Sequence, residues 1–287
     1  MFISCQDLLP MDVPSLLLMG VLWMIFIRLA SFTIFPRHDI RSLKSFLLKI
    51  LWILLPLERQ PIYKYPWPIG FDILSGILKL VVNHWFYRYL SYCGVIGVRE
   101  SMLLMYGFIL TIPFLVDFET ALIRIVTRDR YTLQSFTNFT YLSCSLREFW
   151  GCRYNRIVNI ALKETIFDPV SARSHSRTLA AILTFMVSGI FHAHIVMVIF
   201  NDLSSALPAF VFFLIHGIAC AFEKHFRLKC PEHVGCLMTH SFLWITTPIF
   251  FKPLIQQKFA FIINHPPPLA DAIWFPKLPL PDFCSVR

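Results

Sequence analysis

The chain contains few charged residues, and this shortage argues against most soluble fold classes. Asp, Glu, Lys and Arg make up 15% of its 287 residues, whereas 56% are hydrophobic. Soluble domains carry roughly a quarter charged residues. The sequence also lacks the glycine-rich patterns G-x-x-x-x-G-K and G-x-G-x-x-G, so nothing predicts a P-loop or a dinucleotide site. We therefore expect an all-α, polytopic transmembrane helical bundle that forms one domain over residues 1–287.

The eight cysteines are scattered and form no C-x-x-C pair. Cys230, His233 and Cys236 lie close together in sequence, but a closed zinc site needs four ligands, and no fourth is evident. We therefore expect free thiols and no metal. The sequence also shows no internal repeat, and we expect no cleavable signal peptide because no basic segment precedes the first apolar run.

The net charge of +9 does not indicate nucleic-acid binding in so apolar a chain. Membrane proteins concentrate Lys and Arg in short cytoplasmic loops. The expected partner of the surface is the lipid bilayer, and we expect no nucleic acid.

Apolar runs place the membrane spans. About six to eight spans are expected, and the clearest runs are residues 14–35, 71–90, 102–123, 179–200, 207–222 and about 237–251. The run 46–57 ends at Pro56 and is about half a span, which favours an interfacial helix. With six spans, the basic segments 37–70, 124–177 and 224–229 share one side, so we expect the 124–177 loop to face the cytosol.

Within that loop, S-L-R-E (Ser145 to Glu148) has the form of a capping box, which predicts a helix start. Trp150, Tyr154, Ile157 and Ala161 follow at i, i+4, i+7 and i+11, as on one apolar helix face. This pattern predicts an amphipathic helix on the membrane surface. The alternative is that the helix only follows the positive-inside bias and has no chemical role.

His192 and His194 lie inside the 179–200 span, where ionisable groups are costly and usually functional. They point to nearly opposite helix faces, and Ser188 and Gly189 precede His192 by one turn. A neutral histidine in a low-dielectric pocket can deprotonate an alcohol. His194 is expected to bond a neighbouring helix, and the same structural role stays open for His192. Asn155 is a candidate donor to an oxyanion, and nearby arginines could hold phosphates.

The segment S-L-R-E-F-W-G-C-R-Y-N (Ser145 to Asn155), followed by V-S-G-I-F-H (Val187 to His192), resembles the wax-synthase-like branch of the membrane-bound O-acyltransferases. The resemblance covers about residues 130–255. It implies an endoplasmic-reticulum enzyme that esterifies a hydroxyl with acyl-CoA, with catalytic His192 and its companion Asn155. Substrate- or CoA-binding roles are expected for Trp150, Arg153, Tyr154, Arg156, Ser188, His216 and Glu223.

The sequence departs from that branch at two positions. Cys152 replaces the first of a usual arginine pair, and Ala193 follows His192 where plant wax synthases typically have Glu. The chain is also shorter than typical members, with fewer spans before the motif.

Leu142 and Ser143, which precede the S-L-R-E segment, and Ala193, which follows His192, resemble fungal members of the branch that act in secondary metabolism. The favoured reaction is therefore transfer of acetyl from acetyl-CoA to a hydrophobic alcohol such as a terpenoid. Alternatives are a long-chain fatty-alcohol wax ester synthase, a histidine-lined membrane transporter, and an inactive, truncated family member.

Overall fold

The computed structural model describes residues 13–34, 43–59, 67–93, 102–103, 105, 107, 113–200, 203–225, 231–264, 269 and 272–281. The chain is mostly helical and divides into two compact units. Unit 1 comprises Met1–Pro56 and Asn138–Phe250, and unit 2 comprises Leu57–Thr137 and Phe251–Arg287. Each unit is described by itself.

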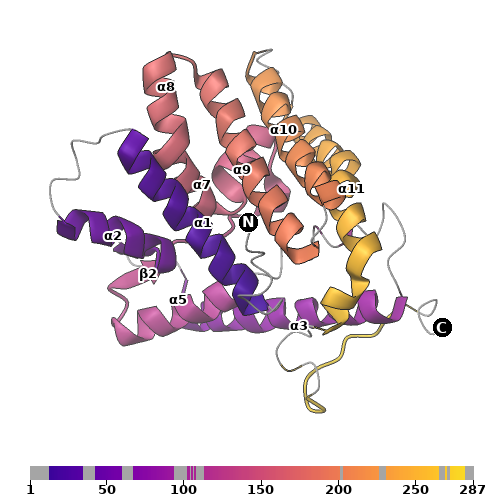
Figure 1. The fold of residues 1–287 in the computed structure, drawn as a ribbon. Coiled ribbons are helices and arrows are strands. Elements are labelled where there is room, and N and C mark those ends of the chain that lie inside the picture. The colour runs from indigo at the N-terminus through magenta and orange to yellow at the C-terminus, as the bar shows by residue number, and fades with distance from the viewer. Residues whose placement is uncertain are drawn as a thin grey trace, which may run out of the picture. The chain divides into compact units, whose positions relative to one another are not determined.

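Unit 1 is a bundle of long helices with a series of short helical segments between them. Its elements are α1 (Val13–Ile34), α2 (Leu43–Leu54), η2 (Thr140–Leu142), α6 (Leu146–Glu148), η3 (Phe149–Arg153), α7 (Arg156–Leu162), η4 (Lys163–Phe167), α8 (Asp168–Ser174), α9 (Arg177–Phe200), α10 (Leu203–His225) and the first part of α11 (Glu232–Asn264). The long helices α9 and α10 follow one another in sequence and pack side by side (Figure 1).

Two glycines allow α9 and α10 to approach closely. A Cβ on Gly189 of α9 would lie 3.1 Å from the backbone oxygen of Phe210 in α10. A Cβ on Gly217 of α10 would lie 2.7 Å from the Cβ of Phe185 in α9. Small residues at helix interfaces are a common device of membrane bundles, because packing there cannot rely on the hydrophobic effect.

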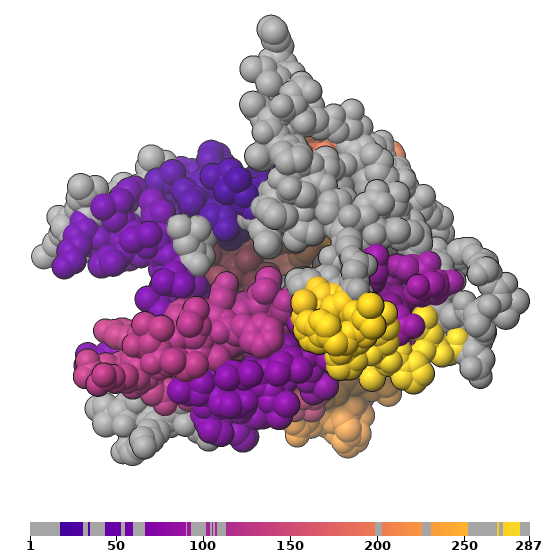
Figure 2. Space-filling view, turned by 90° about the horizontal axis from the view of Figure 1, so that it is seen from below, coloured from indigo at the N-terminus to yellow at the C-terminus, as the bar shows by residue number. Residues whose placement is uncertain are grey.

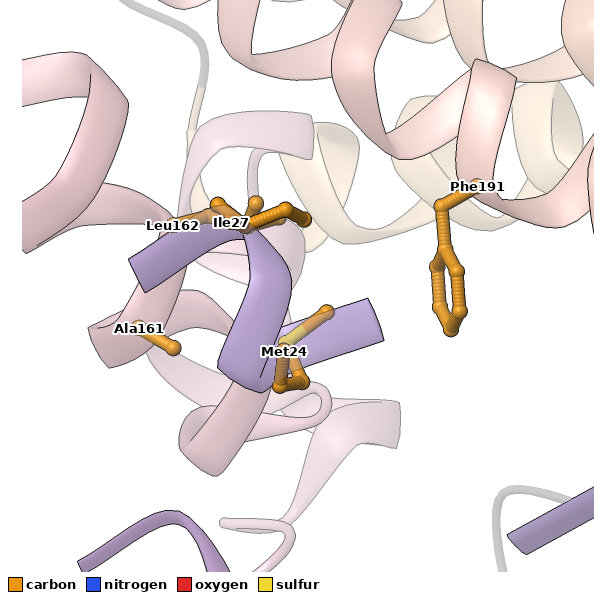
Figure 3. Close-up of a cluster of buried hydrophobic side chains, with 5 residues drawn as sticks. All are labelled: Met24, Ile27, Ala161, Leu162 and Phe191. Carbon is orange, nitrogen blue, oxygen red and sulfur yellow. The ribbon is translucent and has the colours of Figure 1, made fainter. Parts of the chain in front are cut away.

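An apolar cluster docks α1 onto α7 and α9. Met24 and Ile27 of α1 pack with Ala161 and Leu162 of α7 and with Phe191 of α9 (Figure 3). Next to it, Arg28 is 2% exposed and its guanidinium lies 3.0 Å from the Glu164 carboxylate. The α1 helix is therefore held by both apolar burial and a partly buried ion pair.

Unit 2 is built on α3 (Ile69–Cys93) and α5 (Phe114–Val126), which pack along one another (Figure 2). The short strands β1 (Leu57–Arg59) and β2 (Tyr131–Leu133) pair antiparallel, with Leu57 opposite Leu133. The segment 272–281 lies against α3. Phe275 packs on Leu80 and Phe114, and the Trp85 indole donates to the Pro279 carbonyl at 2.8 Å.

Within the described residues, four helices are long and apolar enough to cross a membrane: Ile69–Tyr89, Arg177–Val198, Leu203–His225 and Glu232–Phe251. They confirm four of the predicted spans and give the architecture of an all-α membrane protein. The predicted span 14–35 is helical in α1, but its described apolar part, Leu18–Ala30, is shorter. The α2 helix has 12 residues, in agreement with a segment too short to span.

The predicted span 102–123 lies partly outside the described residues. A turn at Pro113 precedes α5, which begins at Phe114 and continues to Val126. Proline has no N–H to donate and its ring collides with the preceding helical turn, so a helix tends to end before it or start after it. Residues 108–112 lie outside the described residues.

Candidate active site

The motif block, defined as Ser145 to Asn155, begins as the sequence predicts. The Ser145 hydroxyl accepts the Glu148 N–H at 3.0 Å and so caps α6. The Glu148 carboxylate returns to the Cys144 N–H at 2.8 Å, one residue earlier than in a standard capping box. The predicted helix start is confirmed.

The helix does not continue, so the prediction of one amphipathic helix through Ala161 is wrong. Residues Phe149–Arg153 form a π-helical turn (η3), closed by the Tyr154 N–H on the Phe149 carbonyl at 2.8 Å. Tyr154 is then extended, and Asn155 adopts φ 40 and ψ 60, a left-handed conformation that asparagine tolerates better than most residues. The Asn155 Oδ1 accepts the Val158 N–H at 3.2 Å and starts α7 afresh.

The π-helical turn directs Trp150 into a group of aromatic side chains that we call the aromatic cluster. The ring centroid of Trp150 lies 5.2 Å from that of Tyr154 and 5.3 Å from that of His216. Single-turn π-helices are frequent at functional sites. Three phenylalanines of α9 and α10 surround the same indole at 5.7 to 6.3 Å: Phe185, Phe212 and Phe213.

Tyr154 lies on the same side of the turn and stacks on Phe149 at 5.3 Å. Burial raises the pKa of Tyr154 to about 12. Its phenol therefore keeps its proton at physiological pH, and it can donate a hydrogen bond but cannot act as a base.

His192 has one ring nitrogen fixed and one open. Its Nδ1 lies 2.8 Å from the Ser188 carbonyl. A carbonyl can only accept, so Nδ1 carries the proton and Nε2 presents its lone pair. Nε2 has no hydrogen-bond partner among the described residues, and the ring stacks on Phe213 at 4.1 Å. Ser188, a predicted substrate residue, contacts His192 through its backbone.

His216 resembles His192, but its second nitrogen is occupied. Its Nδ1 lies 2.7 Å from the Phe212 carbonyl, so it too is the Nδ1–H tautomer. Its Nε2 lies 3.2 Å from the hydroxyl of Thr246 in α11, and the side chain is fully buried. His194 instead accepts the Trp23 indole N–H at 3.0 Å, which confirms the predicted bond to another helix.

Charged side chains stabilise the conformation of the motif block through hydrogen bonds and ion pairs. The Arg153 guanidinium pairs with Glu148 at 2.7 Å and also donates to the Asn138 carbonyl at 3.2 Å. Glu223 of α10 accepts the Leu146 N–H at 3.1 Å and the Arg147 N–H at 3.2 Å, at the start of α6. Both contacts are structural, and CoA binding by Arg153, Arg156 or Glu223 stays a prediction.

The electrostatics of Glu148 follow from these contacts. Burial alone would raise the pKa of Glu148, but the Cys144 N–H and the Arg153 guanidinium together outweigh it and hold that pKa below its usual range. The carboxylate therefore stays ionised and keeps Arg153 in place.

The structure thus brings Trp150, Tyr154, His192 and His216 together in the aromatic cluster. No contact among the described residues joins Asn155 to His192. Sequence reasoning missed Phe213, which bridges Trp150 and His192, and Thr246, which meets His216. The pair Phe212–Phe213, one turn before His216, was the available signal.

Four cysteines lie in the part of the chain for which the structure gives their state. Cys144, Cys152, Cys220 and Cys236 are free thiols. Within the described ranges, no three His, Cys, Asp or Glu residues gather closely enough to hold a metal ion. Cys230, which the sequence placed near His233 and Cys236, lies outside the described residues.

Comparisons with known proteins concentrate on this region. Residues 133–215 match the model of the Membrane bound O-acyl transferase family. The chain is 32% identical to an acyl-CoA–sterol O-acyltransferase 1 of Arabidopsis thaliana, over 40% of this chain and 37% of that protein. It is 29% identical to a putative long-chain-alcohol O-fatty-acyltransferase 10 of the same plant, over 52% and 47%.

A long-chain-alcohol O-fatty-acyltransferase of Simmondsia chinensis is 26% identical over 58% of this chain and 53% of its own length. The chain spans less than half the length of the two Arabidopsis relatives. The matched residues include the motif block, α9 and most of α10. The part of the chain that carries Trp150, Asn155 and His192 is therefore similar to the membrane-bound O-acyltransferases.

Proposed function

We propose that the chain is an O-acyltransferase, which moves an acyl group from acyl-CoA to the hydroxyl of a hydrophobic alcohol. The observation that carries this proposal is the hydrogen bonding of His192. Its Nδ1 is anchored to the Ser188 carbonyl and its Nε2 is open within an aromatic cluster. This residue lies in the segment that matches the acyltransferase family.

In the proposed reaction, His192 Nε2 accepts the proton of the alcohol as its oxygen attacks the thioester carbonyl carbon. A C–O bond forms, and collapse of the tetrahedral intermediate breaks the C–S bond. The CoA sulfur leaves and takes the proton from the imidazolium, which returns His192 to its starting state. The anchored Nδ1–H fixes the tautomer that this cycle requires.

The roles of Asn155 and of the cationic residues are part of the same proposal. Asn155 supports the site from the start of α7, and Arg153 and Arg156 favour an anionic donor on their side of the block. The donor reaches them from the cytosol and the alcohol enters from the bilayer, in an endoplasmic-reticulum membrane. The topology that underlies this direction is the one predicted from the basic loops.

The alcohol and the acyl length follow from different arguments. The names of the relatives mention sterols and long-chain alcohols, which favours a large apolar alcohol and a fatty acyl-CoA. The acetyl preference and the terpenoid substrate rest only on the resemblance of the motif residues to fungal members of the branch. An assay that compares ester formation from acetyl-CoA with ester formation from a fatty acyl-CoA distinguishes these two proposals.

The test uses membranes from a host that expresses the full chain, supplied with labelled acetyl-CoA or palmitoyl-CoA and with hexadecanol or a sterol. The expected result is an ester together with an equal amount of free CoA. His192→Ala should lower the rate by about 10²–10⁴-fold, the range for loss of a general base, at unchanged protein level. His194→Ala, on the opposite helix face, should retain activity.

Two results would overturn parts of this proposal. Ester formation undiminished in His192→Ala would exclude His192 as the base. Absence of ester from both donors, with the protein inserted in the membrane, would favour the inactive relative or, if solute uptake appeared instead, the histidine-lined transporter.

A further inference from the structure

Trp150 carries a buried hydrogen-bond donor, its indole N–H. Its indole Nε1 is inaccessible and has no hydrogen-bond partner among the described residues. A buried N–H without an acceptor is costly, and native proteins rarely leave one. The indoles of Trp23 and Trp85 show the usual outcome, because they donate to His194 Nδ1 and the Pro279 carbonyl.

The unpartnered N–H lies in the same cluster as the open nitrogen of His192. Both Trp150 and His192 contact the ring of Phe213, with centroids at 5.7 Å and 4.1 Å respectively. His216 lies edge-on to the indole at 5.3 Å. The other ring contacts of Trp150 are with tyrosine and phenylalanine side chains.

The donor predicted from sequence has a different position. The Asn155 Oδ1 accepts the Val158 N–H, which fixes its carboxamide at the start of α7. A base in an aromatic cluster needs a nearby donor for the negative charge that develops on a carbonyl oxygen. Trp150 supplies an uncharged donor there, which carries no net charge into the membrane.

We propose that the Trp150 indole N–H donates a hydrogen bond to the carbonyl oxygen of the acyl thioester. This inference rests on the proposed acyltransferase function and deepens it. As the alcohol oxygen bonds to the carbonyl carbon, the C=O π electrons move onto oxygen, and the Nε1–H contact strengthens. When the C–S bond breaks, the carbonyl re-forms and the contact weakens again.

The test compares two CoA ligands of which only one carries a carbonyl. One is a ketone analogue of acyl-CoA in which CH₂ replaces sulfur, and the other is an S-alkyl-CoA of equal length. Trp150→Phe keeps an aromatic ring and removes the donor. It should weaken the ketone about tenfold, leave the S-alkyl-CoA within about twofold, and lower kcat by about 10²-fold.

Controls separate hydrogen bonding from packing. Trp23→Phe also removes an indole N–H, but that donor already bonds His194, so its effect should not depend on the carbonyl. Benzothienylalanine at position 150 keeps the size and shape of the indole and replaces N–H with sulfur, and it should reproduce the Trp150→Phe pattern.

The outcomes are distinct. Equal weakening of both ligands by Trp150→Phe, or an active benzothienylalanine protein, would overturn the donor role while wild-type ester formation kept the proposed function. A wild-type protein that forms no ester and binds neither ligand would overturn the proposed function and this inference with it.

Discussion

The buried Arg124 network of unit 2 is satisfied by its own partners, whereas the aromatic cluster of unit 1 leaves one donor and one acceptor open. In unit 2, Arg124 is 1% exposed and donates to Asp72, to Asp129 at 2.7 Å and to the Trp67 carbonyl at 2.9 Å. In unit 1, Trp150 Nε1 and His192 Nε2 have no such partners among the described residues.

This contrast marks the Arg124 network as structural and the open groups of the aromatic cluster as candidates for function. A buried charge must be paired and hydrogen-bonded, and Arg124 is. A buried donor without an acceptor is costly for folding alone. An open donor and an open acceptor next to one phenylalanine ring can instead bind a carbonyl and a hydroxyl.

Removal of Arg124 should have the largest effect on stability. Arg124→Met leaves Asp72, a buried carboxylate, without its cation, and breaking such a pair costs about 3–5 kcal/mol. The expected result is a large drop in the thermal unfolding midpoint of the detergent-solubilised protein. The double variant Arg124→Met/Asp72→Asn should recover part of it.

The matched control is the more exposed pair in the same unit. Lys79 lies 2.6 Å from Asp117, with side chains 27% and 19% exposed, so Lys79→Met should cost clearly less. An Arg124→Met protein as stable as the wild type would contradict a supporting role for this network.

The membrane helices could be predicted from the sequence because the bilayer accepts few solutions. Long apolar runs must be helical, so α3, α9, α10 and α11 follow from hydropathy alone. The start of α5 was also indicated in the sequence, by Pro113, but the apolar run around it dominated the prediction.

The site could be predicted only in part. The Ser145 cap and the separation of His192 from His194 follow from local rules and helix geometry. The π-helical turn at Phe149–Arg153 does not, because its i→i+5 pattern depends on how the Trp150 ring packs between α9 and α10. The tautomer of His192 likewise depends on a contact within the folded helix.

Substitution of Gly217 should have an intermediate effect on both stability and the aromatic cluster. The new Cβ of Gly217→Ala would lie 2.7 Å from the Phe185 Cβ, so α9 and α10 must separate. Overpacking of this kind costs about 1–3 kcal/mol, which exceeds the roughly 1 kcal/mol that alanine gains over glycine in a helix. We expect a lower unfolding midpoint and slower ester formation, because the Phe213–His192 stack spans the same helices.

Gly151 is the control for that substitution within unit 1. Nothing lies within 4 Å of a Cβ placed on it, so Gly151→Ala should change the free energy of unfolding by no more than about 0.5 kcal/mol. If the two glycine variants lost stability equally, close packing of α9 on α10 would not be the cause.

The smallest expected effect concerns the carboxylate that holds the motif block. The pKa of Glu148 is lower in the folded chain, so its stabilising contribution is complete above the unfolded pKa of about 4.3 and is lost as the pH falls toward the folded value. Thermal unfolding of wild type and Glu148→Gln from pH 7 to about pH 3 should show a constant difference that shrinks below about pH 4.3. Because Glu148 and Arg153 are partly exposed, this difference should stay below about 1 kcal/mol. In an Arg153→Gln background the same substitution should matter less, since only the Cys144 N–H then remains to be lost. A difference that grew on acidification would have the wrong sign for an ionised Glu148 that stabilises the folded block.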